Sequence, residues 1–131
     1  MNLLLDTHIW VWSVAAPQKL SRRVGSALES ASNELWVSPA SVWELLVLIE
    51  KRRLAISGNP LRWIKEGFRA LALREAPLTV DVAIRSRLIK VDHQDPVDRF
   101  LAATAKVYDL TLVTADERLI RSSGFLVLAN T

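Results

Sequence analysis

The chain has 131 residues, half of them apolar and 24% charged, and a formal net charge of +3, as expected for one soluble domain spanning 1–131. Cysteine is absent, which excludes disulfides, thiolate zinc sites and cysteine nucleophiles and favours a cytoplasmic location. The first apolar run reaches Asp6 after three leucines, so we expect neither a signal peptide nor a membrane span.

Short apolar segments alternate along the chain with segments that carry helix signals. Strands are predicted at 2–5, 34–37, 111–114 and 125–128, with a short strand or extended turn within 76–80. Helices are predicted from Thr7, over 21–32, from Ser38-Pro39 to about Arg52, from Asn59-Pro60, over 81–90, from Asp95-Pro96 to Tyr108, and briefly after Asp116. This alternation predicts an α/β fold with a parallel sheet, in which ligands bind beyond the carboxyl ends of the strands.

Two helices carry further local signals. Ser21 is the expected N-cap of the helix over 21–32. In the helix that starts at Asn59-Pro60, apolar residues recur at helical spacing and predict its buried face: Leu61, Ile64, Phe68 and Leu71.

Four acidic residues fall at or soon after turns between a strand and a helix. Asp6 ends the first strand, Glu44 lies in the helix after the second, Asp98 lies in the first turn after Asp95-Pro96, and Asp116 follows the strand 111–114. Such turns meet at one edge of a parallel sheet, although no clear strand precedes Asp98. The sequence therefore predicts that these carboxylates gather at one edge.

Each acid also has a simpler explanation. Asp6, Asp95 and Asp116 can cap the helices that follow them. Glu44 fits a capping box with Ser41, but a proline at the first helical position makes Ser38 the N-cap and moves Glu44 past the box. The helix of Glu44 is apolar on nearly every face, so an unpaired carboxylate there would be costly to bury.

Converging carboxylates repel one another, and a hard divalent cation relieves that repulsion. Because Mg²⁺ and Mn²⁺ prefer carboxylate oxygens, the residues themselves predict a site for one of these ions. His8 and His93 could form an acid–base pair, but nothing in the sequence brings them together. Glycine-rich phosphate loops are absent, and the basic helix faces are either solvated surface or a footprint for RNA or DNA.

Four motifs, in this order, resemble the PIN domain, and specifically the VapC-like ribonuclease toxins of toxin–antitoxin pairs: DTHIWVW (6–12), SVWEL (41–45), DPVDRFLAATA (95–105) and LVTAD (112–116). The resemblance covers essentially the whole chain. It implies a Rossmann-like three-layer sandwich with a central parallel sheet. It also implies an acidic pocket that holds Mg²⁺ or Mn²⁺ and cuts single-stranded segments of RNA, leaving a 5′ phosphate.

The resemblance also implies roles for individual residues. The catalytic positions of the family fall on Asp6, Glu44, Asp98 and Asp116. Asp6 and Asp98 would be the principal metal ligands, and Glu44 would bind the metal directly or through water. Glu44 or Asp116 could accept the proton of the attacking water.

Two further residues and three partners follow from the same resemblance. Thr114 could orient a carboxylate or water, or simply end its strand. Arg99 could contact the substrate phosphate or pair with a nearby acid. The partners implied are RNA, a cognate antitoxin that covers the acidic pocket, and a second copy of the chain in a homodimer; no membrane is implied.

Readings from other classes stay open. In a non-catalytic RNA-binding module, the acids would be caps and the basic helices would bind. A receiver-type phosphoacceptor needs paired acids after its first strand and a late lysine, whereas only Asn2 precedes the leucines and no lysine follows Lys106. The D-x-D signature of haloacid-dehalogenase-like phosphatases is absent, because Thr7 and His8 follow Asp6.

Overall fold

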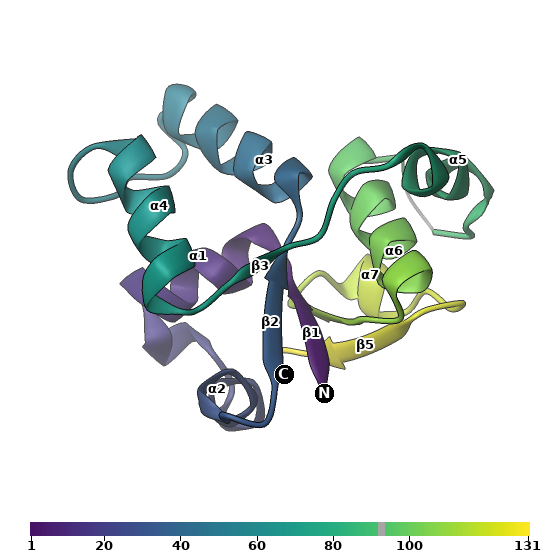
Figure 1. Cartoon of the computed structure of the whole chain (residues 1–131), viewed down its shortest axis with the longest axis horizontal. Coiled ribbons are helices and arrows are strands. Elements are labelled where there is room, and N and C mark those ends of the chain that lie inside the picture. The colour runs from purple at the N-terminus through teal and green to yellow at the C-terminus, as the bar shows by residue number, and fades with distance from the viewer. Residues whose placement is uncertain (92–93) are drawn as a thin grey trace.

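The structure is a computed structural model that describes residues 1–91 and 94–131 (Figure 1). Its elements, in chain order, are β1 (Asn2–Leu5), α1 (Thr7–Ala15), a 3₁₀ turn (Pro17–Lys19), α2 (Arg22–Glu29), β2 (Glu34–Val37), α3 (Pro39–Glu50), α4 (Pro60–Ala70), β3 (Arg74–Glu75), α5 (Val80–Leu88), α6 (Pro96–Tyr108), β4 (Thr111–Thr114), α7 (Glu117–Ile120) and β5 (Leu126–Ala129). No helix in these described ranges is long and apolar enough to cross a membrane.

The strands form one sheet in the order β3-β2-β1-β4-β5, and every pair is parallel. β1 lies at the centre, where Leu3 pairs with Leu35 of β2 and Leu4 pairs with Leu112 of β4. The chain builds outward from β1 to β2 and β3, and later returns to its other side as β4 and β5. The order therefore reverses at β1, and ligand sites in such sheets lie beyond the carboxyl ends of the strands at this point.

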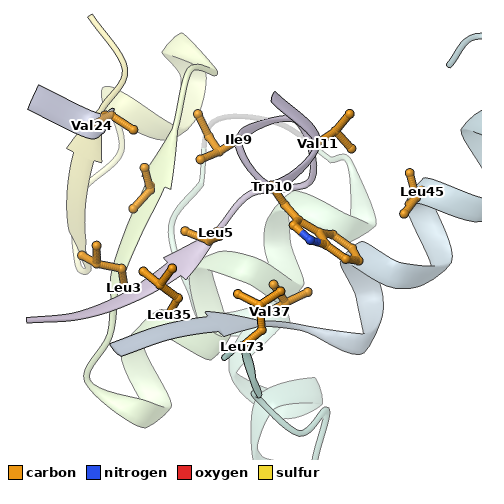
Figure 2. Packing of buried hydrophobic residues seen from close by; sticks show 11 residues of the cluster. Leu3, Leu5, Ile9, Trp10, Val11, Val24, Leu35, Val37, Leu45 and Leu73 are labelled. Atoms are coloured by element: carbon orange, nitrogen blue, oxygen red, sulfur yellow. The ribbon is translucent and has the colours of Figure 1, made fainter. Parts of the chain in front are cut away.

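Helices cover both faces of the sheet, which explains why β1 is apolar without alternation. Leu3 and Leu5 pack on one face with side chains of α1 to α4, including Trp10 and Leu45 (Figure 2). Leu4 points to the opposite face and joins a second cluster built mainly from α6. Figure 1 shows the corresponding layers, with α1, α2 and α4 on one side of the sheet and α5, α6 and α7 on the other. The predicted three-layer α/β fold with a central parallel sheet is confirmed.

Most of the expected helix starts are found where the sequence places them. Ser21 caps α2 by accepting the amide N–H of Val24, and α3, α4 and α6 each begin at a proline. α2 ends at Glu29, three residues before the expected boundary at 32, and the chain then turns into β2. Capping residues fix where these helices begin, whereas their ends depend on packing.

Two expectations in the segment 60–80 are wrong. The short edge strand is Arg74–Glu75, which pairs with Trp36 and Val37, and it lies before the expected segment 76–80. Leu61 does not belong to the buried face of α4 and is 62% exposed. The ring of Trp63 takes that place, with its centroid 5.4 Å from the ring of Trp10.

Candidate active site

A cavity of about 390 Å³ opens at the carboxyl edge of the sheet, beyond β1 and β4. Nine residues line it: Asp6, His8, Trp12, Glu44, Asp95, Asp98, Ala115, Asp116 and Arg118. We call this cavity the acidic pocket. All four acids singled out from the sequence lie in it, together with a fifth, Asp95.

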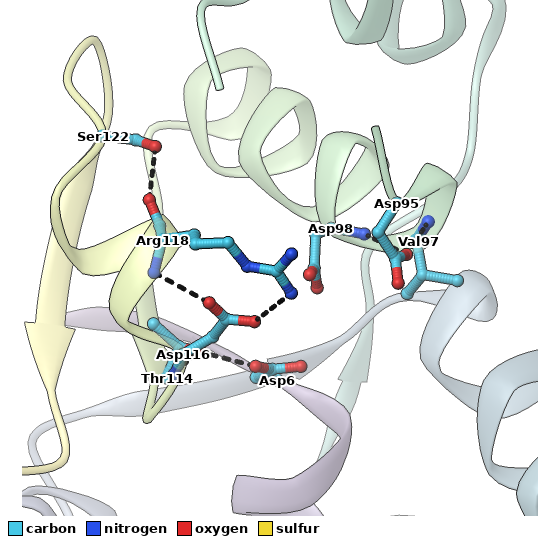
Figure 3. Close-up of polar contacts among 8 residues, drawn as sticks. All are labelled: Asp6, Asp95, Val97, Asp98, Thr114, Asp116, Arg118 and Ser122. Carbon is cyan, nitrogen blue, oxygen red and sulfur yellow. Dashed lines mark hydrogen bonds and ion pairs between the residues drawn. The ribbon is translucent and has the colours of Figure 1, made fainter. Parts of the chain in front are cut away.

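Asp6 serves both as a helix cap and as a wall of the acidic pocket. One carboxylate oxygen accepts the amide N–H of Thr7 at 2.7 Å, which caps α1, and the other accepts the hydroxyl of Thr114 at 2.7 Å (Figure 3). Burial raises the pKa of Asp6, and these two hydrogen bonds oppose that rise. The side chain is therefore anchored at both oxygens and held rigidly at the end of β1.

Asp98 has a strongly raised pKa. It lies in the first turn of α6 and is only 8% exposed, while the neighbouring Asp95 caps the helix by accepting the amide N–H groups of Val97 and Asp98. Burial, together with repulsion from four nearby acids, raises the pKa of Asp98 from 3.8 to about 8; these acids are Asp6, Asp95, Asp116 and Glu44. Asp95 therefore caps α6, whereas Asp98, in the first turn of the same helix, contributes a carboxyl group to the acidic pocket.

Glu44 reaches the pocket from the second turn of α3. Ser38 caps this helix by accepting the amide N–H of Ala40, and the hydroxyl of Ser41 has no hydrogen-bond partner in the described part of the chain, so no capping box forms. Burial raises the pKa of Glu44, Thr7 opposes the rise, and Asp6 adds to it. The position of Glu44 therefore has no capping explanation.

Asp116 and Thr114 stand at the end of β4. Asp116 caps α7 by accepting the amide N–H of Arg118 at 2.8 Å. The hydroxyl of Thr114 donates to Asp6 and accepts the amide N–H of Asp116 at 3.0 Å. Thr114 therefore links the ends of β1 and β4 and orients a carboxylate, the first of its two expected roles.

Thr114→Val is expected to lower the free energy of unfolding by about 1–3 kcal/mol, because a buried carboxylate oxygen and an amide N–H both lose their partner. Any activity that depends on the position of Asp6 should fall by about 10- to 100-fold. Urea denaturation and an activity assay measure the two effects. Thr111→Val is the matched control on the same strand, since the hydroxyl of Thr111 makes no hydrogen bond among the described residues. Equal behaviour of the two variants would contradict the linking role.

Arg99, considered above as a phosphate contact or an ion-pair partner of a nearby acid, is buried between α5 and α6. Its side chain is 6% exposed, and its guanidinium donates to the backbone carbonyls of Ser86, Ile89 and Val91 at 2.9, 2.9 and 3.3 Å. These carbonyls lie at the end of α5 and just beyond it. Arg99 therefore fastens α5 to α6, and it is not among the described residues that line the acidic pocket.

Several pocket residues were not singled out from the sequence. Trp12 lies one helical turn after His8 on α1, and their ring centroids are 5.8 Å apart. Trp12 could have been found from its sequence position, because residues four apart on a helix lie on the same face and His8 is at the pocket end of α1. Arg118, two residues after Asp116, had no such signal. His93, the second member of the considered histidine pair, lies outside the described residues.

The donor set of the acidic pocket suits a hard cation. Its ligand candidates offer carboxylate oxygens, and the hydroxyl of Thr7 lies within reach of the Glu44 carboxylate. Mutual repulsion among the acids is visible in the raised pKa of Asp98. As they stand, no three His, Cys, Asp or Glu side chains of the described residues are close enough to enclose an ion. The chemistry therefore fits Mg²⁺ or Mn²⁺, and binding would require the carboxylates to draw together.

Comparison with known proteins gives consistent results. The model of the PIN domain family matches residues 3–124. Ribonuclease VapC22 of Mycobacterium tuberculosis (strain ATCC 25618 / H37Rv) is 36% identical over 119 residues, which is 90% of this chain and 89% of that protein.

Solved structures share the fold at lower identity. VapBC2 from Rickettsia felis, bound to a DNA fragment from its promoter, has a TM-score of 0.73 and 16% identity, with 98% of each chain covered. DNA-bound VapBC from Salmonella typhimurium has a TM-score of 0.69 and 19% identity, with 100% of this chain and 99% of that chain covered. These structures show the shared fold. The family match over residues 3–124 and the relative at 36% identity show that the chain belongs to the PIN domain family.

Proposed function

We propose that the protein is a metal-dependent endoribonuclease of the VapC toxin type, which hydrolyses phosphodiester bonds in single-stranded segments of RNA. The observation that carries the proposal is the convergence of five carboxylates on one pocket at the switch point of the sheet. A relative with 36% identity is named as a ribonuclease, which supports the same activity.

Asp6, Asp98 and Glu44 are the residues that would hold Mg²⁺ or Mn²⁺, Glu44 directly or through water. Such an ion, when bound, lowers the pKa of a water molecule and stabilises negative charge on phosphate oxygens. Hydrogen bonds from Thr7 and Thr114 already hold the side chain of Asp6 in place. Binding of an ion would therefore cost little further side-chain entropy at this ligand. The raised pKa of Asp98 means that ion binding would release a proton near neutral pH.

Either Glu44 or Asp116 would act on the attacking water. Both line the acidic pocket, Glu44 from α3 and Asp116 from just before α7, and either carboxylate can accept the proton of that water. In-line attack on phosphorus displaces the 3′ oxygen and leaves a 5′ phosphate on the other fragment.

The proposal includes a protein partner. Solved structures with this fold are VapBC complexes, so we propose a cognate antitoxin that blocks the acidic pocket. The homodimer implied by the resemblance stays a prediction.

Cleavage of a mixed small-RNA substrate by purified, antitoxin-free protein tests the activity. Discrete fragments with 5′ phosphates are expected with Mn²⁺ or Mg²⁺, none are expected with EDTA, and activity should return when Mn²⁺ is added back in excess. Parallel reactions with the two ions identify the preferred one. Folded protein that binds RNA and never cleaves it would favour the non-catalytic binding module instead.

A further inference from the structure

Two basic side chains, His8 and Arg118, line the acidic pocket together with the five carboxylates. Arg118 is the second residue of the one-turn helix α7, and its guanidinium is 3.5 Å from a carboxylate oxygen of Asp116. Figure 3 shows this side chain extending from α7 over Asp116 toward the part of the pocket where Asp98 lies. The guanidinium therefore occupies the region where carboxylates would have to gather around a divalent ion.

The backbone of Arg118 is fixed while its side chain is half exposed. Its amide N–H donates to Asp116, its carbonyl accepts the hydroxyl of Ser122, and its side chain is 51% exposed. Rotation about the side-chain bonds can therefore move the guanidinium without disturbing α7.

The ion pair with Asp116 is not optimised for that one partner. A charge-assisted hydrogen bond between a guanidinium and a carboxylate is usually about 2.7–2.9 Å long, whereas this contact measures 3.5 Å. Exposed pairs of this kind contribute little stability. Its position is better explained by the combined attraction of several carboxylates than by one salt bridge.

A divalent ion and a guanidinium cannot both occupy this space without cost. Both are cations, and their repulsion falls only slowly with distance inside a pocket of low dielectric constant. The divalent ion carries twice the charge and coordinates the oxygens directly, so it prevails when it is available. A displaced guanidinium at the pocket rim has the planar, forked donor geometry that binds phosphate.

We propose that Arg118 is a built-in counter-ion of the acidic pocket, which the divalent cation displaces and which then contacts a phosphate of the RNA substrate. This inference rests on the proposed function, because it takes the pocket to be the metal site. It assigns Arg118 two opposed effects, since it weakens metal binding and strengthens RNA binding.

Mn²⁺ titration of the metal-stripped protein by isothermal calorimetry tests the first effect. Arg118→Ala and Arg118→Gln are expected to bind Mn²⁺ about five- to tenfold more tightly than the wild type, because a competing positive charge is gone. Arg118→Lys keeps the charge and should restore the wild-type affinity. Arg121→Ala is the matched control: it removes the same charge at the end of the same helix, outside the acidic pocket, and should change the affinity by less than about twofold.

The Michaelis constant for RNA at saturating Mn²⁺ tests the second effect. Arg118→Gln should raise it about tenfold, while Arg121→Ala should leave it nearly unchanged. A purely structural role cannot tighten metal binding and weaken RNA binding at once. Circular dichroism checks that each variant is folded, and the glutamine variant keeps most of the arginine stem.

Two failures can be told apart. Suppose that the wild type binds Mn²⁺ but that Arg118→Ala and Arg118→Gln bind it no more tightly than Arg121→Ala does. The counter-ion role of Arg118 is then overturned, and the proposed nuclease stands. If the wild type itself does not bind Mn²⁺ although it is folded, the metal site and the role of Arg118 both fall.

Discussion

Asp98→Asn is expected to lower the rate of RNA cleavage by about a thousandfold or more while leaving the fold intact, because it removes one negative ligand without changing the shape of the side chain. Asp98 caps no helix, since Asp95 fills that position, so the substitution leaves the N-cap of α6 in place. The cleavage rate at saturating Mn²⁺ measures the effect, and circular dichroism checks the fold. Asp6→Asn should also abolish cleavage, and asparagine still serves as an N-cap.

Asp81→Asn is the matched control for this experiment. Asp81 is also an aspartate in the first turn of a helix, α5, but it is exposed and lies outside the acidic pocket. Its variant should cleave RNA at the wild-type rate. Full activity in Asp98→Asn would refute the assignment of Asp98 as a metal ligand.

Asp98→Asn is also expected to stabilise the metal-free protein at neutral pH. The pKa of Asp98 is raised from 3.8 to about 8 in the folded state. Between these values the unfolded chain has released a proton that the folded chain still holds, so the free energy of unfolding falls as pH rises. The stabilising contribution of this group is fully present below about pH 4 and lost by about pH 8, and it amounts to about 5–6 kcal/mol.

The asparagine variant lacks this dependence. At about pH 8, in EDTA, its free energy of unfolding should exceed that of the wild type by about 5–6 kcal/mol, and the difference should vanish at about pH 4. Urea denaturation across the pH range measures both curves, and the difference between them isolates Asp98 from the other acids. Saturating Mn²⁺ should narrow the gap at neutral pH, because only the wild type keeps the full ligand set. A gap that does not change with pH would show that Asp98 ionises normally.

Local signals predicted much of the fold. Three consecutive leucines before Asp6 indicated a strand buried on both faces, and β1 is the central strand. Prolines at first helical positions placed the starts of α3, α4 and α6 correctly. These signals succeed because N-caps and prolines restrict the backbone within a few residues of themselves.

Long-range contacts escaped prediction. β3 is only two residues long and exists because it pairs with the end of β2 at the sheet edge, so its own residues carry little strand signal. Leu61 fits the apolar period of α4, but Trp63 fills the space beside Trp10 instead. Which face of a helix is buried depends on what the neighbouring helix offers, and periodicity alone does not contain that information.

The same limit applies to the acidic pocket. The sequence identified the acids that follow strands because the edge of a parallel sheet collects them. It could not distinguish Arg99, which points to the carbonyls at the end of α5, from Arg118, which points into the acidic pocket. Both are single arginines close to an aspartate, and only the direction of each side chain separates them.

Three of the five pocket acids also begin helices: Asp6 caps α1, Asp95 caps α6 and Asp116 caps α7. Selection for a foldable chain therefore preserves these three positions even in a lineage that no longer benefits from the activity. Asp98 and Glu44 have no such second duty. Point mutations that inactivate such a nuclease but leave it folded are therefore expected mainly at Asp98 and Glu44. Mutations at the three capping acids will more often prevent the protein from folding.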